Sequence, residues 1–213
     1  AAGMPLIVDN TVPTPYLLRP FEYGADIVVH SLTKYLGGHG NSIGGAIVDS
    51  GRFPWAQHAQ RFTRLTQPDP SYHGVVYTDA LGPAAFIGRA RVVPLRNTGA
   101  AISPFNAFLV LQGIETLALR MDRINANALA MAHHLEGHPA VRWVRYAGLP
   151  SHADHALAKK YVGGHASGVL SFGIAGGRAA GERFLDALNL FVRLVNIGDA
   201  KSLATHPAST THR

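Results

Sequence analysis

The sequence contains no cysteine, and this absence removes several kinds of chemistry at once. Disulfides, thiolate nucleophiles and zinc sites built on cysteine are all excluded. No apolar run approaches the roughly 20 residues that a membrane-spanning helix requires. The first residues, AAGMPLIVDN, lack the basic and apolar regions of a signal peptide. We therefore expect a globular protein that has no membrane partner and works in the cytoplasm.

The sequence is also poor in charge, since charged residues make up 15% of it against roughly 25% in an ordinary domain. A chain short of charge usually buries part of its surface against something else. Its 19 Lys and Arg against 13 Asp and Glu give a net charge of +6, but the cations are scattered along the chain. Nucleic-acid-binding proteins concentrate these residues on one stripe, so we exclude nucleic acid as the main partner.

Three short apolar runs stand out in the first quarter of the chain, at residues 6–8, 27–29 and 46–48. Runs of this length, separated by loop-sized or helix-sized spacers, predict buried strands of an α/β sheet. Residues 50–100 are less periodic and contain several prolines. We expect short helices and an irregular excursion there.

A long amphipathic helix is predicted from Ser103 onward, with Ser103 as its N-cap and Pro104 at its first position. Its apolar stripe consists of Leu117, Met121, Ile124, Ala128, Met131 and Leu135. Gly137 and the proline that follows soon after it end the pattern. A helix of this length in so small a chain is expected to bridge two domains, with Gly113 as the candidate point at which it divides.

The last third of the chain has a different pattern. Strands are predicted at 141–146, 168–174 and 191–195, with a helix at 179–188 and a polar loop at 204–212 that no further element closes. This pattern indicates a small α+β unit. The predicted architecture is therefore α/β, with a first part at 1–102, a bridging helix at 103–137 and a C-terminal α+β part at 138–213; the family resemblance described below implies that the first is a partial large domain and the last a partial C-terminal domain.

Two of the predicted strands end on reactive side chains. Asp9 follows the first strand, and Ser31, Thr33 and Lys34 follow the second. Ligands of open α/β sheets bind at the carboxyl ends of the strands, so both groups face one crevice if the strands are neighbours. A desolvated lysine is a nucleophile, an acid can hold a cationic ring nitrogen, and hydroxyls suit a phosphate. Together they match pyridoxal phosphate; the alternative is a solvent-facing lysine and a capping aspartate.

Other motifs are weaker. Gly38 and Gly40 lack the third glycine of a dinucleotide fingerprint, and no Walker loop is present. His152 and His155, like the pair at 133–134, have no supporting acid or cysteine, so we expect surface histidines and no metal.

Beyond this pattern, particular segments resemble a known family. VDNT at 8–11 and ADIVVHSLTKYLGGHG at 25–40 are similar to the cofactor segment of the pyridoxal-phosphate enzymes of Cys/Met metabolism. The similarity continues through 103–123 and 198–212, so it covers essentially the whole chain. The segment QPDPSYHG at 67–74 and the sequence of 103–123 look most like the O-acetylhomoserine sulfhydrylases of that family.

The resemblance implies roles for particular residues. Lys34 would be the Schiff-base lysine, Asp9 the acid at the pyridine nitrogen, and Ser31 and Thr33 the phosphate-binding hydroxyls. Ser202 would lie near the substrate carboxylate. The fold would be the second half of a fold-type I large domain followed by the C-terminal domain. Segments that the family has on both sides are absent from this sequence, so we expect both flanks to be missing.

The resemblance also implies a reaction. O-acetylhomoserine and sulfide would give homocysteine and acetate, within a homotetramer built as a dimer of dimers. Two alternatives stay open. One is methionine γ-lyase or cystathionine γ-synthase or lyase activity on the same scaffold, and the other is a non-catalytic interaction fragment.

Overall fold

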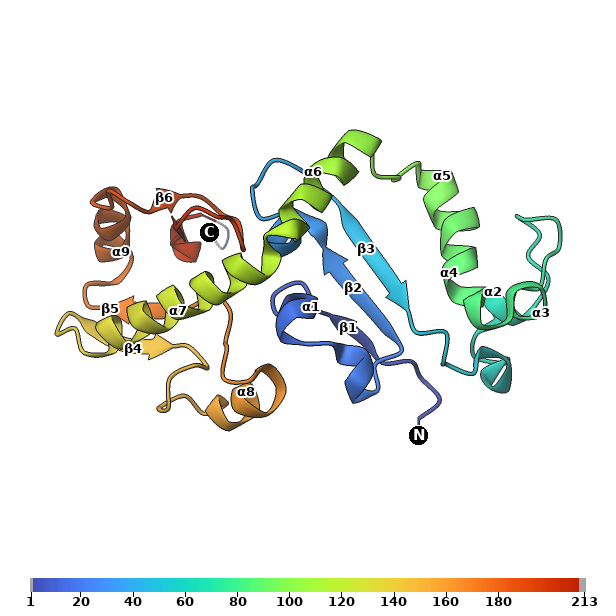
Figure 1. Ribbon diagram of the computed structural model, residues 1–213, viewed down its shortest axis with the longest axis horizontal. Coiled ribbons are helices and arrows are strands. Elements are labelled where there is room, and N and C mark those ends of the chain that lie inside the picture. Colours follow the sequence, from blue (N-terminus) through green and yellow to red (C-terminus); the bar gives the residue numbers. More distant parts are fainter. Residues whose placement is uncertain (1, 211–213) are drawn as a thin grey trace.

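The computed structural model describes residues 2–210, which form an elongated α/β arrangement around three small sheets (Figure 1). The first sheet has the order β1 (Ile7–Asp9), β2 (Ile27–Ser31) and β3 (Gly45–Asp49). β1 and β2 are parallel, and β3 is antiparallel to β2. The three predicted strands are thus confirmed, and the two that precede the reactive side chains are neighbours.

Burial within this sheet differs from the expectation of three buried strands. The central strand β2 is buried, and Ile27 is 1% exposed. The outer strands keep apolar side chains in contact with solvent, since Ile7 is 53% and Ile47 is 49% exposed. A strand is covered only where another element packs on it, and the described residues supply such cover mainly to β2.

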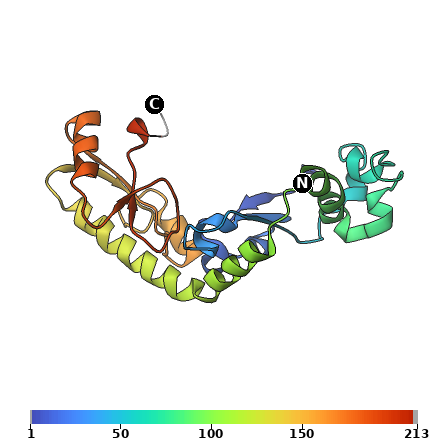
Figure 2. The ribbon, with the colours of Figure 1, turned by 90° about the horizontal axis from the view of Figure 1, so that it is seen from above.

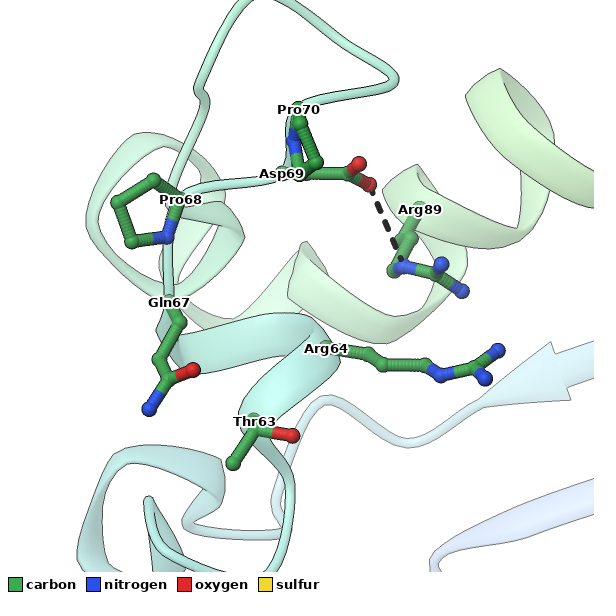
Figure 3. A pocket seen from close by; sticks show the side chains of 7 residues that line it. All are labelled: Thr63, Arg64, Gln67, Pro68, Asp69, Pro70 and Arg89. Carbon is green, nitrogen blue, oxygen red and sulfur yellow. Dashed lines mark ion pairs between the residues drawn. The ribbon is translucent and has the colours of Figure 1, made fainter.

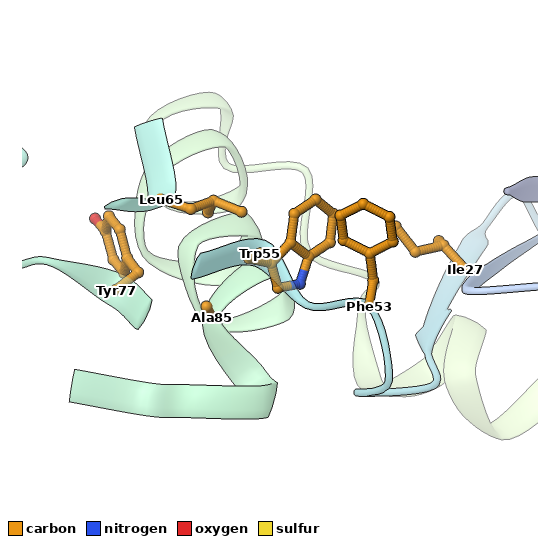
Figure 4. Close-up of a cluster of buried hydrophobic side chains, with 6 residues drawn as sticks. All are labelled: Ile27, Phe53, Trp55, Leu65, Tyr77 and Ala85. Atoms are coloured by element: carbon orange, nitrogen blue, oxygen red, sulfur yellow. The ribbon is translucent and has the colours of Figure 1, made fainter. Parts of the chain in front are cut away.

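The connection from β1 to β2 contains α1 (Thr14–Leu17) and the short helix η1 (Pro20–Tyr23). After β3, residues 50–100 form the predicted excursion of short helices. These are η3 (Trp55–His58), α2 (Thr63–Thr66), α3 (Tyr77–Leu81), η4 (Gly82–Ala84), α4 (Ala85–Ala90), η5 (Arg91–Leu95) and α5 (Arg96–Thr98). Of these, η3, α2, α3 and α4 contribute to one buried apolar cluster of Ile27, Phe53, Trp55, Leu65, Tyr77 and Ala85 (Figure 4). The cluster fastens the excursion to β2 through Ile27.

The predicted long helix is present as two helices, α6 (Pro104–Glu115) and α7 (Leu117–Glu136). Its start is confirmed, because the Ser103 hydroxyl accepts the Asn106 N–H at 3.1 Å. The division lies at Thr116, where ψ is 7°, and Gly113 stays helical. Gly113 instead permits a close approach, since a Cβ there would clash with the carbonyl oxygen of Gly37. The glycine is required by packing between helix and loop.

The buried face of α7 departs in part from the predicted stripe. It consists of Leu117, Met121, Asn125, Ala128 and Ala132. The predicted Ile124, Met131 and Leu135 are only half-buried. The observed residues recur at steps of four and three, which keeps them on one side of a helix with 3.6 residues per turn. The buried residue at this level of the helix is the polar Asn125, whereas the apolar pattern predicts its neighbour Ile124.

The C-terminal part contains β4 (Val141–Arg145), α8 (His155–Val162), β5 (Ser171–Ile174), α9 (Gly177–Asp186), β6 (Val192–Arg193), β7 (Leu203–Ala204) and η6 (Pro207–Ser209). β4 pairs with β5 in antiparallel fashion, and β6 pairs with β7 in parallel. The polar loop predicted at 204–212 begins at the end of β7, and its described residues contain η6. Residues 211 and 212 of that loop lie outside the described residues.

Seen from above, α6 and α7 follow one bent path that joins the two ends of the molecule (Figure 2). The excursion lies at one end and the C-terminal sheets lie at the other, with the first sheet between them (Figure 1). No helix between residues 2 and 210 is long and apolar enough to cross a membrane.

Candidate functional site

The parallel pairing of β1 with β2 brings the predicted residues to one edge of the sheet. Asp9, the last residue of β1, lies opposite Val29, and β2 runs on to Ser31. The next five residues form a wide helical turn, η2 (Leu32–Leu36). Lys34 leaves the helical backbone within it, with φ −92° and ψ −131°. The carboxylate and the lysine therefore follow the ends of neighbouring strands, as the sequence predicts.

The amine of Lys34 has a partner that sequence reasoning missed. Lys34 Nζ donates to Asn196 Oδ1 at 2.8 Å, and the lysine is half-buried. Asn196 follows β6, after the apolar run at 191–195. It is thus a polar side chain directly after the strand predicted at 191–195, although β6 itself ends at Arg193.

The segment 196–200, which we call the strap, rests on η2 and on the glycine turn that follows it. Ala200 N–H donates to the carbonyl oxygen of Gly38 at 2.8 Å. Gly198 has φ +79° and lies so close to Tyr35 that a Cβ would clash with it. Gly40 likewise leaves room for the Asp199 carboxylate. Gly40 and Gly198 therefore permit a close approach between two parts of this chain that are far apart in the sequence.

The Asp9 carboxylate is held in its charged form by its neighbour Thr11. Hydrogen bonds from the Thr11 side chain, and from its N–H at 2.9 Å, lower the pKa of Asp9. Thr11 Oγ1 also accepts the Ser31 N–H at 2.8 Å. One threonine therefore ties the ends of β1 and β2 together and keeps Asp9 ionised.

His30, the residue before Ser31, lies against this edge and was not singled out by the sequence. It is 8% exposed, and its Nδ1 has no hydrogen-bond partner among the described residues. Burial lowers the pKa of His30, and the negative charge of Asp9 opposes that shift in part. The imidazole is consequently neutral at neutral pH.

The predicted hydroxyls have different surroundings. Thr33 Oγ1 accepts the Gly44 N–H at 3.1 Å and donates to the Gly44 carbonyl at 3.4 Å, so it stabilises the turn between η2 and β3. The Ser31 hydroxyl is half-buried and makes no hydrogen bond to another described residue. Ser202 is exposed, and its backbone carbonyl accepts the Val192 N–H at 2.9 Å. The residue that the structure places on Lys34 is Asn196.

Arg120, a side chain of α7, holds η2 in place through hydrogen bonds to its backbone. Its guanidinium donates to the carbonyl oxygens of Tyr35 at 2.8 Å and Gly113 at 2.6 Å, and its Nε donates to Thr116. Burial lowers the pKa of Arg120. Arg120 therefore connects the backbone of η2 with the last turn of α6.

A separate hollow of about 270 Å³ lies in the excursion and contains none of the predicted site residues. Arg64 and Arg89 point into it, and Arg89 Nε lies 3.6 Å from Asp69 (Figure 3). Asp69 also accepts hydrogen bonds from Ser71 and Tyr77. This part of QPDPSYHG is therefore held by an internal network. No group of three metal-ligating side chains occurs within residues 2–210.

The fold and the site define an α/β protein in which a half-buried lysine and an ionised aspartate follow adjacent parallel strands. The family model for the Cys/Met metabolism PLP-dependent enzymes matches residues 1–213. The chain belongs to that family.

Particular relatives agree with this membership. The chain is 53% identical to an O-acetyl-L-homoserine sulfhydrylase of Leptospira meyeri over 99% of this chain and 49% of the relative. It is 51% identical to a homocysteine synthase of Schizosaccharomyces pombe over 100% of this chain and 50% of that protein. The chain thus spans about half the length of the curated relatives it matches.

A solved structure shares the fold. It is a crystal structure from Campylobacter jejuni, assigned as an O-acetylhomoserine (thiol)-lyase, that contains N'-pyridoxyl-lysine-5'-monophosphate. The two chains are 42% identical and superpose with a TM-score of 0.88, over 99% of this chain and 50% of that one.

Proposed function

We propose that the protein containing this chain converts O-acetylhomoserine and sulfide to homocysteine and acetate, with pyridoxal 5'-phosphate as its cofactor. The observation that carries this proposal is the placement of the Lys34 amine and the ionised Asp9 at one sheet edge in a chain of this family. The names of the relatives support the choice of reaction.

The residues at this edge fit that cofactor. The half-buried Lys34 amine offers a nucleophile, and Asp9 offers a carboxylate that stays charged. The Ser31 hydroxyl has its donor available, and Thr33 Oγ1 is a second hydroxyl on the same turn. When bound, the cofactor withdraws electrons from the substrate carbon next to its amino group.

Lys34 would perform the proton transfers. Its Nζ would form the covalent link to the cofactor and release it to the substrate amine. The freed amine would then take a proton from Cα of the substrate and move protons at Cβ, as a general base and acid. Acetate leaves from Cγ, hydrosulfide forms the new carbon–sulfur bond there, and Lys34 regains its starting state.

The other predicted residues would hold charges in place. Asp9 would keep a ring nitrogen protonated, because Thr11 maintains its negative charge. Ser31 and Thr33 would donate to the phosphate, for which Thr33 must turn its hydroxyl away from Gly44. Ser202 is proposed near the substrate carboxylate on the strength of its motif alone.

We propose the same larger organisation as the sequence predicts. Residues 1–102 would belong to a fold-type I large domain, 103–137 would connect it to the C-terminal domain, and 138–213 would belong to the latter. A cytoplasmic homotetramer remains the expectation, and the exposed Ile7 and Ile47 are consistent with further packing on the first sheet.

The proposal is tested by product analysis on the full-length protein. O-acetylhomoserine with sulfide should yield homocysteine, and Lys34→Ala should abolish this product together with the visible absorption of the bound cofactor. Turnover of methionine alone, or formation of cystathionine, would instead support the alternative activities. No cofactor binding by the intact protein would support the non-catalytic interpretation.

A further inference from the structure

The hydrogen bond from Lys34 Nζ to Asn196 Oδ1 is the contact that fixes the position of the lysine amine. Its length of 2.8 Å is that of a charge-assisted bond. A lysine side chain has four rotatable bonds, so an amine without an acceptor samples many positions. The partially buried amide oxygen of Asn196 selects one of them.

Asn196 is itself held in place independently of this bond. Its strap is anchored by the Ala200 N–H on the Gly38 carbonyl and by the contact of Gly198 with Tyr35. The Asp199 side chain is 4% exposed, and its Oδ1 accepts the Lys201 N–H at 2.9 Å. The amide therefore approaches the amine from a rigid support.

We propose that Asn196 is a positioning residue for Lys34, which aims the free amine for covalent capture of the cofactor and for proton transfer. This inference rests on the proposed function, because it assumes that Lys34 is the cofactor lysine. It assigns the role to an amide oxygen at 196, which none of the sequence motifs singled out.

The chemistry of the amide predicts a specific effect on the amine. An acceptor oxygen favours the ammonium form over the neutral amine, and a carboxylate at the same place favours it more strongly. The carboxylate that Asn196→Asp introduces should thus move the pH midpoint of cofactor capture upward. The other charged or titratable groups near η2 and the glycine turn are unchanged in this variant; these are Asp9, His30, Tyr35, His39, Arg120 and Asp199.

The test measures covalent capture of pyridoxal 5'-phosphate by the cofactor-free protein from about pH 6 to about pH 10. Borohydride reduction and peptide mass spectrometry identify the labelled lysine. The variants are Asn196→Ala, the isosteric Asn196→Asp and, as a smaller polar replacement, Asn196→Ser. Ile197→Ala is the matched control, since Ile197 is a partly exposed neighbour on the same strap. Circular dichroism establishes that each variant is folded.

We expect the capture rate at high pH, where the amine is neutral, to fall about tenfold in Asn196→Ala, which corresponds to the loss of one hydrogen bond between two neutral groups. Asn196→Asp should keep this high-pH rate within about threefold and raise the midpoint by about one pH unit or more. Ile197→Ala should change neither quantity.

Two results would overturn the inference. Equal rates and midpoints in wild type, Asn196→Ala and Asn196→Asp, with residue 34 labelled, would refute the role of Asn196 and leave the proposed function intact. Labelling of a lysine other than Lys34 would refute the proposed function and this inference together. If Asn196→Ala does not fold, the high-pH rate of Asn196→Ser and the midpoint of Asn196→Asp decide the question, and wild-type values of both would refute the role of Asn196.

Discussion

The Tyr35 hydroxyl accepts the N–H of Gly168 at 3.2 Å, although the two residues are 133 positions apart. Tyr35 is adjacent to Lys34 and is 1% exposed. Next to Gly168, the Ser167 carbonyl accepts the Tyr146 hydroxyl at 2.8 Å, and the Ser167 N–H donates to Asn125. Burial raises the pKa of Tyr146 to about 12. This buried network links the lysine turn to the C-terminal sheets.

Tyr35→Phe should weaken that link. The substitution leaves the ring in place and removes the acceptor of the Gly168 N–H, so the free energy of unfolding should fall by about 1–2 kcal/mol. Chemical denaturation followed by circular dichroism measures the change. Tyr23→Phe is the control, because Tyr23 is 51% exposed. Equal stability of the two variants would show that the hydroxyl contributes nothing.

Gly113→Ala should separate α6 from the lysine turn. The added methyl group would meet the carbonyl oxygen of Gly37, and backbone cannot move away as a side chain can. We expect a loss of roughly 1–3 kcal/mol in unfolding free energy. Gly137→Ala at the end of α7 is a matched control, since its nearest contact would be an ordinary 3.7 Å. A tolerated Gly113→Ala would contradict the close approach described here.

Thr11→Val should raise the pKa of Asp9 toward its ordinary value, because the side-chain hydrogen bond is the largest cause that lowers it. Carboxyl-carbon NMR titration of the wild type and the variant measures the difference. A lowered carboxyl pKa stabilises the folded state above the ordinary carboxyl pKa, and this contribution is lost as pH falls through the lowered value. Thr98→Val, on an exposed threonine in α5, should leave the Asp9 titration unchanged.

His30 predicts a second pH dependence. Its lowered pKa means that the unfolded chain binds a proton more readily than the folded chain. Stability contributed by the neutral imidazole is therefore present above its ordinary pKa and is lost as pH falls through the lowered one. His30→Gln should flatten the slope of unfolding free energy against pH in this window. His73→Gln, at an exposed loop position, should keep the wild-type slope.

The sequence predicts those features whose causes lie close together along the chain. The three strands, the Ser103 cap and the placement of Asp9 and Lys34 at one sheet edge all follow from local apolar runs and turn residues. The direction of β3 and the pairing of β7 depend on partners that no local pattern specifies.

The sequence analysis missed the roles of Gly113 and Asn196 for the same reason, because both depend on partners that are distant along the chain. From the sequence, Gly113 is interpreted as a helix break, and only the structure shows that Gly37 packs against it. Asn196 lies 162 positions from Lys34, and only the folded chain brings the two together. Ser202, chosen from a motif, lies six residues away from the polar side chain that contacts the amine.

The separation of Lys34 and Asn196 also has a consequence in time. Ribosomes add about 5–20 residues per second, so the lysine is synthesised roughly ten to thirty seconds before the amide that receives its hydrogen bond. β1 and β2 can pair during that interval, while the amine still has no acceptor. The hydrogen bond between Lys34 and Asn196 can therefore form only after translation has passed the strap, and the lysine amine of a nascent chain has no such acceptor before then.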